Sequence, residues 1–511
     1  MGGQYRGGSR KMVGRSLSGA YSLLPVKARS ALRRTLPAPA KAALHSLLPA
    51  GTGSPDQGVR PPPPLAVRML VGLWFAAMEA RTRYERVRSG AAVLEGRQRV
   101  YFFIRGAYGM GGTIRTVFNT ADHLADQGYD VEVVSLLRSR EGPFLPLDPR
   151  VRLRPLFDER SRWADRPPVP GEENPPLPFG GPALLRRLDG WASMLTHRGD
   201  AAYDRSSLLT DVILVRALRG LRPGVVVLTR PVLNVAGARF AAGAVRTVGQ
   251  EHMNFALYSE AMKAWMLRSY GKLDALTVLT EGDERDYRQA LQGSGTRLYR
   301  IPNGLPALPD TLSDQTAPVV VAAGRLTRQK GFDLLISAFE QVASSHPEWT
   351  LRIYGDGPRQ AALEGQIAAA GLDSQVRLMG RSKRMASDMA AGSIFALSSR
   401  FEGFGMVLIE AMSAGLPVVS FDCPRGPRDI VEDGHDGILV PAEDVGAMAA
   451  GLSRLMDDQQ LRVKMAFAAR EKAGHYSMEH IGEKWHELFA DLALPRQARR
   501  RPRLHGATTS P

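Results

Sequence analysis

The sequence has 511 residues but a single cysteine, Cys423, which excludes a disulfide framework and a cysteine-built metal site. It also contains no Asp-x-Asp pair and no clustered histidines, so the common sequence patterns of a metal centre are missing. One cysteine is compatible with a reducing cytosol. We therefore expect no bound metal and no other resident cofactor.

Long apolar runs are also missing. The most apolar stretch near the start, MLVGLWFAAM at residues 69–78, is flanked by Arg68 and Glu79, whereas a membrane-spanning helix needs about 20 apolar residues. The first 60 residues do not show the basic start, apolar core and small-residue cleavage site of a secretory signal. These absences predict a cytoplasmic protein without a spanning segment.

Positive charge is abundant only at the two ends of the sequence. The net charge is +16, yet residues 1–100 carry 17 Lys and Arg against 4 acids and residues 491–511 carry 5 against 1, so the remainder is nearly neutral. Around the linker GTGSPDQGVRPPPP, Leu alternates with Lys and Arg at roughly helical spacing. This pattern fits helices on an anionic membrane surface, a poorly ordered extension, or helices packed on the body. We expect no nucleic-acid partner, because regularly interleaved stacking aromatics are missing.

From Arg99 onward the pattern alternates between strands and helices. VYFFIRG reads as a strand, GMGGT as a glycine loop, IRTVFNTADHLADQG as a helix and YDVEVVSLL as the next strand, which makes a βαβ opening. A second such start occurs at VVVAAGRL, residues 319–326. Two successive halves of this kind predict two doubly wound α/β domains, with a ligand site in the cleft where the strand carboxyl ends face each other.

The loop GRLTRQKG places Arg325 and Lys330 between a strand and a helix. A strand end, a flexible backbone, two cations and a helix amino terminus together favour a diphosphate site. The alternative is an ordinary charged surface loop.

The stretch RFEGFGMVLIEAMSAGLPVVS contains two carboxylates, Glu402 and Glu410. Gly403 and Gly405 discourage helix, so Glu402 is expected in a loop and Glu410 in a short, mostly buried helix. The amides of this loop could hold a phosphate, which leaves Glu402 free to accept hydrogen bonds from hydroxyls, while Glu410 could bind a vicinal diol such as a ribose. Two surface glutamates on an amphipathic helix would fit poorly with their apolar neighbours.

Several of these motifs occur together and in a fixed order. GRLTRQKG, IYGDGP, EGFGMVLIE and the run EAMSAGLPVVSFDCPRGPRDIVEDGHDGILVP resemble retaining glycosyltransferases of family 4, of the cell-envelope polysaccharide and teichoic-acid type. The resemblance is specific over about residues 318–445 and looser from about 100 to 490. It implies the GT-B fold: two Rossmann-like doubly wound domains facing a central cleft, here with a basic N-terminal extension.

The resemblance also implies a domain organisation. The expected segments are a basic extension, partly disordered or on a membrane surface (1–98), an acceptor-binding domain (99–312), a nucleotide-sugar-binding domain (313–480), a helix that crosses back to the first domain (481–494) and a basic tail (495–511).

Residue roles follow from the same resemblance. Arg325 and Lys330 look like the pair that holds the donor pyrophosphate, Glu402 like the acid that meets the transferred sugar, and Glu410 like the acid on the donor ribose. His252, in GQEHMNF, falls where many members keep a histidine near the sugar; a structural histidine is the alternative.

We take Glu402, Arg325, Lys330 and His252 as the catalytic candidates. Further donor contacts are expected from the nucleobase loop and from the helix start, namely Gly380, Arg381, Met385, Gly403, Phe404, Gly405 and Met406. The phosphate and acceptor loop is expected at Gly111, Gly112 and Arg115.

The sequence therefore predicts a metal-independent hexosyltransferase that moves a sugar from a nucleotide donor to a glycan, lipid-linked or polymer acceptor of the cell envelope. The resemblance implies retention of the anomeric configuration. UDP is the favoured carrier, and a GDP-mannose-dependent mannosyltransferase is the alternative. A catalytically silent scaffold of the same fold is the alternative from another class, although all four charged site residues, Arg325, Lys330, Glu402 and Glu410, are present. A cytoplasmic location is expected, with peripheral membrane association as a further hypothesis.

Overall fold

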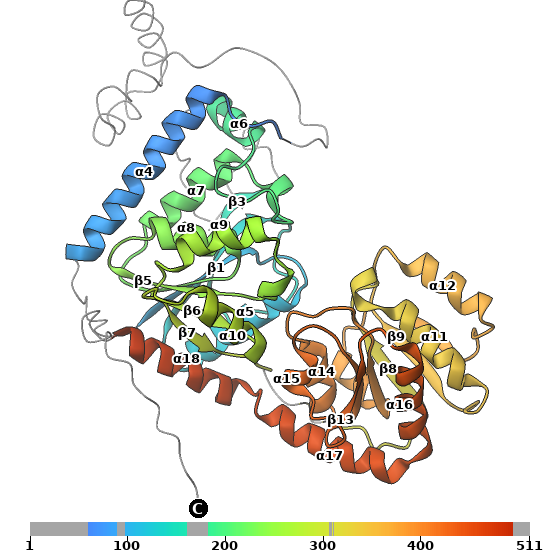
Figure 1. The fold of residues 1–511 in the computed structure, drawn as a ribbon. Helices are drawn as coiled ribbons and strands as arrows, with labels where there is room; N and C mark the ends of the chain where they lie inside the picture. Colours follow the sequence, from blue (N-terminus) through green and yellow to red (C-terminus); the bar gives the residue numbers. More distant parts are fainter. Residues whose placement is uncertain (1–59, 89–97, 161–181, 306–308, 310, 494–511) are drawn as a thin grey trace, which may run out of the picture.

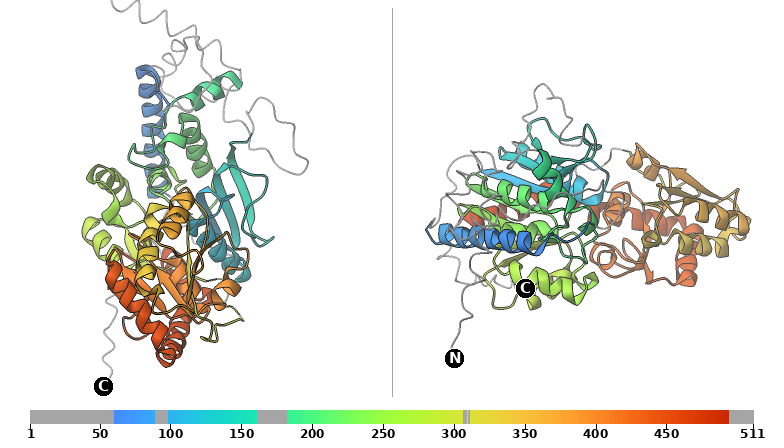
Figure 2. Two further views of the ribbon diagram at one scale, coloured as in Figure 1. Left: turned by 90° about the vertical axis from the view of Figure 1, so that its right-hand side faces the viewer. Right: turned by 90° about the horizontal axis from the view of Figure 1, so that it is seen from above.

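The computed structural model describes residues 60–88, 98–160, 182–305, 309 and 311–493. These residues form two α/β lobes, one built mainly from the first half of the chain and one from the second (Figure 1). Each lobe contains one parallel sheet with helices packed against it, which confirms the predicted pair of doubly wound domains. Figure 2 shows the same two lobes from the side and from above.

The first domain has a seven-stranded parallel sheet in the order β3-β2-β1-β4-β5-β6-β7. Its strands are β1 (Arg99–Gly106), β2 (Asp130–Arg138), β3 (Arg152–Asp158), β4 (Gly224–Leu228), β5 (Val245–Gln250), β6 (Ala275–Val278) and β7 (Arg297–Arg300). Its helices are α5 (Gly112–Asp126), α6 (Pro182–Gly190), α7 (Leu208–Arg219), α8 (Pro231–Phe240), α9 (Glu260–Tyr270) and α10 (Glu281–Ala290), with 3-10 turns η1 (Tyr203–Arg205) and η2 (Phe255–Leu257).

The second domain has a six-stranded parallel sheet in the order β10-β9-β8-β11-β12-β13. Its strands are β8 (Val319–Ala323), β9 (Thr350–Tyr354), β10 (Val376–Gly380), β11 (Ile394–Leu397), β12 (Val418–Asp422) and β13 (Gly437–Pro441). Its helices are η3 (Arg328–Lys330), α11 (Phe332–Ala343), α12 (Gln360–Ala369), α13 (Met385–Ala390), α14 (Met406–Ser413), α15 (Pro427–Ile430), α16 (Val445–Asp457) and α17 (Gln459–Gly474).

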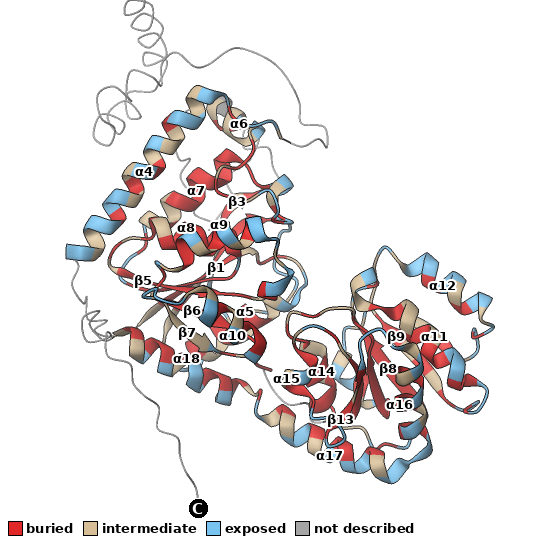
Figure 3. Ribbon diagram, viewed as in Figure 1, coloured by how far each residue is buried: buried red, intermediate tan, exposed pale blue. Residues whose placement is uncertain are grey.

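The central strands are apolar along their whole length. Every residue of β4 (GVVVL) and of β8 (VVVAA) is buried, as Figure 3 shows for the sheet interiors. Because helices cover both faces of a parallel sheet, such strands carry no alternation of polar and apolar residues. The strand order reverses between β1 and β4 and between β8 and β11, so each sheet has a crevice at the carboxyl ends of these strands.

Two chain segments connect the domains, and they lie side by side. The amide of Leu305 donates to the carbonyl of Tyr476 at 2.8 Å, and the amide of Met478 donates to Leu305 at 3.0 Å. The chain then continues into α18 (Met478–Ala493), which returns to the first domain. There Trp485 is buried and meets the ring of Phe102 edge-on, with 6.2 Å between the ring centroids.

The first domain begins before the boundary expected from the sequence. Residues 65–88, assigned above to the basic extension, form the 24-residue helix α4 (Leu65–Arg88), and its buried side chains Leu70, Phe75 and Met78 lie on the first domain. Glu85 of α4 also pairs with Arg219 of α7. This part of the extension is therefore a helix packed on the body, because its apolar stripe finds a complementary surface there. Residues 1–59 and 89–97 of the extension and the whole basic tail lie outside the described residues.

Among the described residues, none of the helices has both the length and the hydropathy needed to cross a membrane.

Candidate active site

The two crevices meet at the contact between the domains. Asn254, which follows β5, donates from Nδ2 to the carbonyl of Glu402 at 2.6 Å and to that of Pro424 at 3.1 Å. The carbonyl oxygen of His252 lies against Gly403, where an added β-carbon would be only 2.3 Å away. A glycine at 403 is therefore required for the two loops to approach this closely.

Glu402 lies at the centre of this contact, in the loop between β11 and α14. Its side chain is buried, and its Oε1 accepts hydrogen bonds from Lys330 Nζ and from Ser399 Oγ, both at 2.6 Å. Lys330 comes from the loop between β8 and α11, 72 residues earlier in the chain. The fold thus brings together the carboxylate and the cation that the sequence placed in separate motifs.

Gly331 allows the Lys330 loop to reach Glu402. Its φ of 63° lies in the left-handed region, and a β-carbon there would be 1.9 Å from the carbonyl oxygen of Ser398. A side chain at 331 would push the loop away from the end of β11. The hydroxyl of Ser398 in turn donates to the carbonyl of Lys330 at 3.0 Å, which fixes the position of the lysine.

Arg325 lies at the carboxyl end of β8 with an exposed side chain that makes no ion pair or hydrogen bond to any residue described in the structure. The nearby loop after β10 carries Arg381, which pairs with Asp356 at 2.5 Å. Arg325 is close enough to lower the pKa of Asp356, after the larger effect of Arg381. The expected phosphate-binding and nucleobase loops therefore border the same end of the sheet.

The other residues of the expected nucleobase loop have backbone or packing roles. Gly380 adopts a left-handed φ of 69° and accepts a hydrogen bond from Gly355 at 2.8 Å. Met385 begins α13 and packs against the apolar core.

Glu410 lies within α14, and it forms an ion pair with Arg115 of α5 in the first domain. Burial raises the pKa of Glu410, and the charge of Arg115 opposes this shift. The sequence predicted a short, mostly buried helix that contains the carboxylate of Glu410, and the structure confirms this helix. It also shows that Arg115 is the ion-pair partner of Glu410. The two residues are 295 positions apart.

The start of α14 presents backbone groups to the cleft. Gly405, with a left-handed φ of 100°, precedes Met406, the first residue of the helix. The side chain of Phe404 is buried and packs edge-on against Tyr476, with ring centroids 5.8 Å apart. Any donor contact made by Phe404 must therefore come from its backbone.

The glycine loop of the first domain remains open. Gly111 and Gly112 are exposed, and β-carbons added to them would meet no atom within 4 Å. Because α5 begins at Gly112, the loop leaves room for a ligand at the amino terminus of that helix.

His252 lies in the domain contact as a neutral side chain. Burial, with a smaller effect of the positive charge of Arg230, lowers its pKa to about 3. Its Nε2 is buried and has no hydrogen-bond partner among the described residues. The imidazole is therefore available to exchange a hydrogen bond with a sugar hydroxyl.

Cys423 is buried beside the cleft. Burial and then the charge of Glu402 raise the pKa of its thiol to about 12. A thiol of this kind is a poor nucleophile at neutral pH.

Two residues of the site were missed from the sequence, Ser399 and Asn254. Ser399 holds Glu402, and Asn254 connects the domains. Both are polar residues in loops that follow strands of a parallel sheet, Ser399 after β11 and Asn254 after β5, and that position is the signal that could have identified them.

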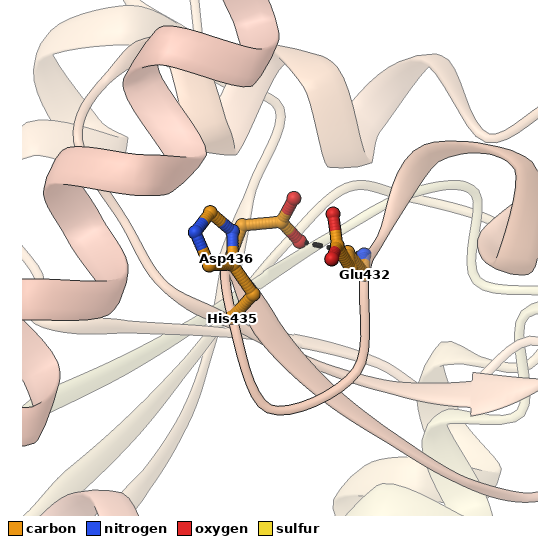
Figure 4. Close-up of side chains that lie close together, drawn as sticks. All are labelled: Glu432, His435 and Asp436. Carbon is orange, nitrogen blue, oxygen red and sulfur yellow. Dashed lines mark hydrogen bonds between the residues drawn. The ribbon is translucent and has the colours of Figure 1, made fainter. Parts of the chain in front are cut away.

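A separate cluster of three side chains lies outside this cleft. Glu432, His435 and Asp436 come together in the turn before β13, and the Asp436 carboxylate accepts a hydrogen bond from the Glu432 amide at 2.8 Å (Figure 4). This turn is at the amino ends of the strands, whereas Arg325 and Glu402 follow carboxyl ends. The Asp436 carboxylate closes the turn.

The two halves of the chain match two known domain families. Residues 111–304 match the glycosyl transferase 4-like domain, and residues 308–472 match the glycosyl transferases group 1 domain. The chain therefore contains two glycosyltransferase domains, a 4-like domain followed by a group 1 domain. These matches confirm the resemblance seen in the sequence.

Two relatives of this glycosyltransferase have names that refer to polysaccharides. It is 35% identical over 409 residues to the exopolysaccharide phosphotransferase of Streptomyces coelicolor, and the match covers 79% of this chain but only 42% of that longer protein. It is 26% identical over 402 residues to the amylovoran biosynthesis glycosyltransferase AmsD of Erwinia amylovora, and the match covers 76% of this chain and 99% of that protein.

The solved structure of S. aureus TarM confirms the GT-B fold of this glycosyltransferase. The TM-score is 0.60 at 17% sequence identity, and the alignment covers 77% of this chain and 99% of TarM. That structure is a complex with fondaparinux, alpha-GlcNAc-glycerol and UDP.

Proposed function

We propose that this chain is a retaining hexosyltransferase that moves a sugar from a nucleotide donor to a cell-envelope glycan, lipid-linked or polymer acceptor. The observation that carries the proposal is the Lys330–Glu402 pair at 2.6 Å. It lies near the loop of His252 and near Arg325, whose side chain has no partner among the described residues. UDP is the favoured carrier, which is supported by the UDP in the TarM complex, and GDP is the alternative.

The chemistry follows from the charges. Breaking the bond between sugar and phosphate develops negative charge on the diphosphate and positive charge on the sugar ring. Arg325, Lys330 and the amides at the start of α14 stabilise the first charge, and this is usually the largest catalytic contribution in a closed cleft. Glu402 accepts hydrogen bonds from the sugar hydroxyls once Lys330 turns toward the diphosphate.

Retention requires the acceptor to attack from the face that the diphosphate leaves. We propose that the departing phosphate oxygen takes the proton of the acceptor hydroxyl, so that bond formation and proton transfer occur on the same face. The new bond joins the acceptor oxygen to the anomeric carbon, and the nucleoside diphosphate leaves with the bonding electrons and the proton. Nuclear magnetic resonance of the product would assign its anomeric configuration, and transfer in excess EDTA would test metal independence.

Ligand-induced thermal stabilisation tests the donor site first. A panel of UDP, GDP and ADP sugars with the free nucleotides should raise the melting temperature for one nucleotide class, because ligands that bind only the native state stabilise it. Arg325→Ala should remove the shift, whereas Arg328→Ala, an exposed arginine of the same loop, should keep it. If no nucleotide shifts the melting temperature, the catalytically silent scaffold becomes the better description.

Peripheral membrane association is a second part of the proposal. The outer face of α4 exposes Leu65, Met69 and Leu73, which are 52–71% accessible and spaced by four residues, and it exposes several arginines as well. Apolar and basic side chains on one helix face favour an anionic lipid surface. Binding to vesicles that contain anionic lipid should fall when these three residues are replaced by Ser. Unchanged binding of this variant would reject α4 as the contact.

A further inference from the structure

A small pocket in the first domain is lined by none of the residues proposed above to bind the donor. It is located at the carboxyl ends of β1 and β2, between α7 and α8. Its polar lining residues are Arg105, Thr196, Arg205, Ser206, Thr210 and Asp211.

Arg105 and Arg205 line this pocket, and Arg230 lies beside Arg105, because Phe103 of β1 pairs with Leu228 of β4 two residues earlier on each strand. Arg105 belongs to β1, Arg205 to η1, and Arg230 follows β4. None of the three forms an ion pair or donates a side-chain hydrogen bond to any residue in the described part of the chain, and Nη2 of Arg105 is fully buried. Burial, followed by the positive charge of Arg230 and a smaller effect of Arg205, lowers the pKa of Arg105 to about 10.

Two acids are close enough to offset part of this charge. Asp200 and Glu159 both act to raise the pKa of Arg105, but neither forms an ion pair with it. Asp200 uses one carboxylate oxygen to accept the amide of Ala202 at 2.8 Å. Asp211, a third acid in the lining, accepts hydrogen bonds from Ser193 and from the amides of Met194 and Leu195. The three acids therefore balance the charge of the arginines without pairing with their guanidinium groups.

The buried guanidinium of Arg462 shows how such a group is paired within this protein. Arg462 donates to the carbonyls of Leu455 at 2.6 Å and Met456 at 3.0 Å. A buried guanidinium without a partner is costly, and like charges nearby add to the cost. An anion supplied by a ligand would remove both costs, since guanidinium groups bind phosphate with paired hydrogen bonds.

The pocket is connected to the catalytic residues through one arginine. Arg230 follows β4, whose last residue, Leu228, pairs with Phe103 of β1 on one side and with Gly249 of β5 on the other. Its positive charge acts to lower the pKa of both Arg105 and His252. The backbone of His252 contacts Gly403, next to Glu402. An anion at the arginines would thus lie on the first-domain side of the cleft, near the point of sugar transfer.

We propose that Arg105, Arg205 and Arg230 bind a phosphate group of the acceptor, beside the hydroxyl that receives the sugar. This inference rests on the proposed function and narrows it to acceptors that carry phosphate. Such a phosphate comes either from a polyol phosphate polymer or from a lipid diphosphate carrier, and the chemistry of recognition is the same for both.

The test measures binding of glycerol 3-phosphate to the full chain by calorimetry, with neutral glycerol as the blank and a saturating nucleotide to occupy the donor site. Arg105→Gln should weaken binding about tenfold, the loss expected for one charge-assisted contact. The double variant Arg205→Gln/Arg230→Gln repeats the test at two exposed positions where packing is not disturbed. Arg222→Gln is the matched control. Arg222 is an exposed arginine that precedes β4, so it lies at the amino end of the strand, opposite to the end that carries Arg230.

The inference is overturned if glycerol 3-phosphate binds the double variant and the wild type equally, or if glycerol binds as well as glycerol 3-phosphate. A polyol phosphate oligomer and a detergent-solubilised polyprenyl diphosphate then distinguish the two sources, and the one whose binding depends on the arginines is the acceptor class. Nucleotide binding by the same variants is measured separately. If the wild type binds no nucleotide, the proposed function is rejected. If glycerol 3-phosphate binds equally to the wild type and to the arginine variants, only this inference is rejected.

Discussion

Arg115 of the first domain forms an ion pair with Glu410 of the second, so one contact joins the glycine loop of one crevice to the helix of the other. The same carboxylate is the one expected on the donor ribose. We propose that the donor ribose competes with Arg115 for this carboxylate.

Replacing the two partners of this pair should have opposite effects on nucleotide affinity. Glu410→Ala removes the acceptor for the ribose hydroxyls and should weaken binding about tenfold. Arg115→Ala removes the side chain that competes with the ribose for Glu410, so it should leave the nucleotide affinity unchanged or increase it. Calorimetric titration with the nucleotide identified by thermal stabilisation provides the measurement. Equal weakening in both variants would mean that Arg115 contacts the nucleotide itself.

Glu402→Gln should separate catalysis from binding. The amide keeps the size of the side chain but cannot pair with Lys330 or accept as strongly from the sugar hydroxyls. We expect turnover to fall by about 100-fold or more, while nucleotide affinity changes less than about threefold. Glu443→Gln is the control, because Glu443 pairs with Arg400 at 3.0 Å on the outer side of the same loop. An equal loss of affinity and turnover in Glu402→Gln would contradict the assigned role.

Gly331→Ala should destabilise the second domain. The left-handed backbone and the carbonyl of Ser398, 1.9 Å from the new β-carbon, both oppose the substitution. We expect a loss of several kcal/mol, of which about 1–2 comes from the backbone alone. Gly365→Ala is the matched control in α12, where a β-carbon meets no atom within 4 Å, and it should stabilise by up to about 1 kcal/mol. Thermal denaturation of both variants tests the contrast, and similar melting temperatures would refute it.

Glu251→Gln should change the pH dependence of stability. Burial raises the pKa of Glu251 to about 7, although Tyr258, Tyr270 and Asn234 donate hydrogen bonds to it. The folded state therefore binds this proton more tightly than the unfolded state, whose pKa is near the ordinary value of 4.5.

The sign of the effect follows directly. The wild type loses stability as pH rises from about 4.5 to about 7, by about 3 kcal/mol in total, because the buried carboxylate must ionise. Glu251→Gln lacks this loss, so its melting temperature should exceed that of the wild type at pH 8 and approach it at pH 5. A difference between the two proteins that does not vary with pH would show that Glu251 does not titrate in this range.

Much of the fold could be predicted because it depends on local patterns. The apolar runs of β4 and β8, the helix start at Met406 and the glycines at 331 and 405 are each visible in a short window of sequence. Residues 65–88 show where this approach fails. Their mixture of Leu, Arg and Ala is compatible with a lipid surface, a disordered segment or a packed helix, and only the partner surface on the first domain distinguishes these outcomes.

The candidate site, too, could be predicted only in part from the sequence. The sequence by itself determined which residues carry charge near strand ends: Arg325, Lys330, Glu402 and Glu410 are each recognisable from their own motif. Only the tertiary structure decided how they are paired, with Lys330 on Glu402 and Arg115 on Glu410. It also placed Arg105 near Arg230, with no partner for Arg105 in the described part of the chain. The physical reason is that backbone propensity and apolar periodicity act over a few residues, whereas ion pairs across a cleft join positions up to 295 residues apart and depend on how two separately folded sheets face each other.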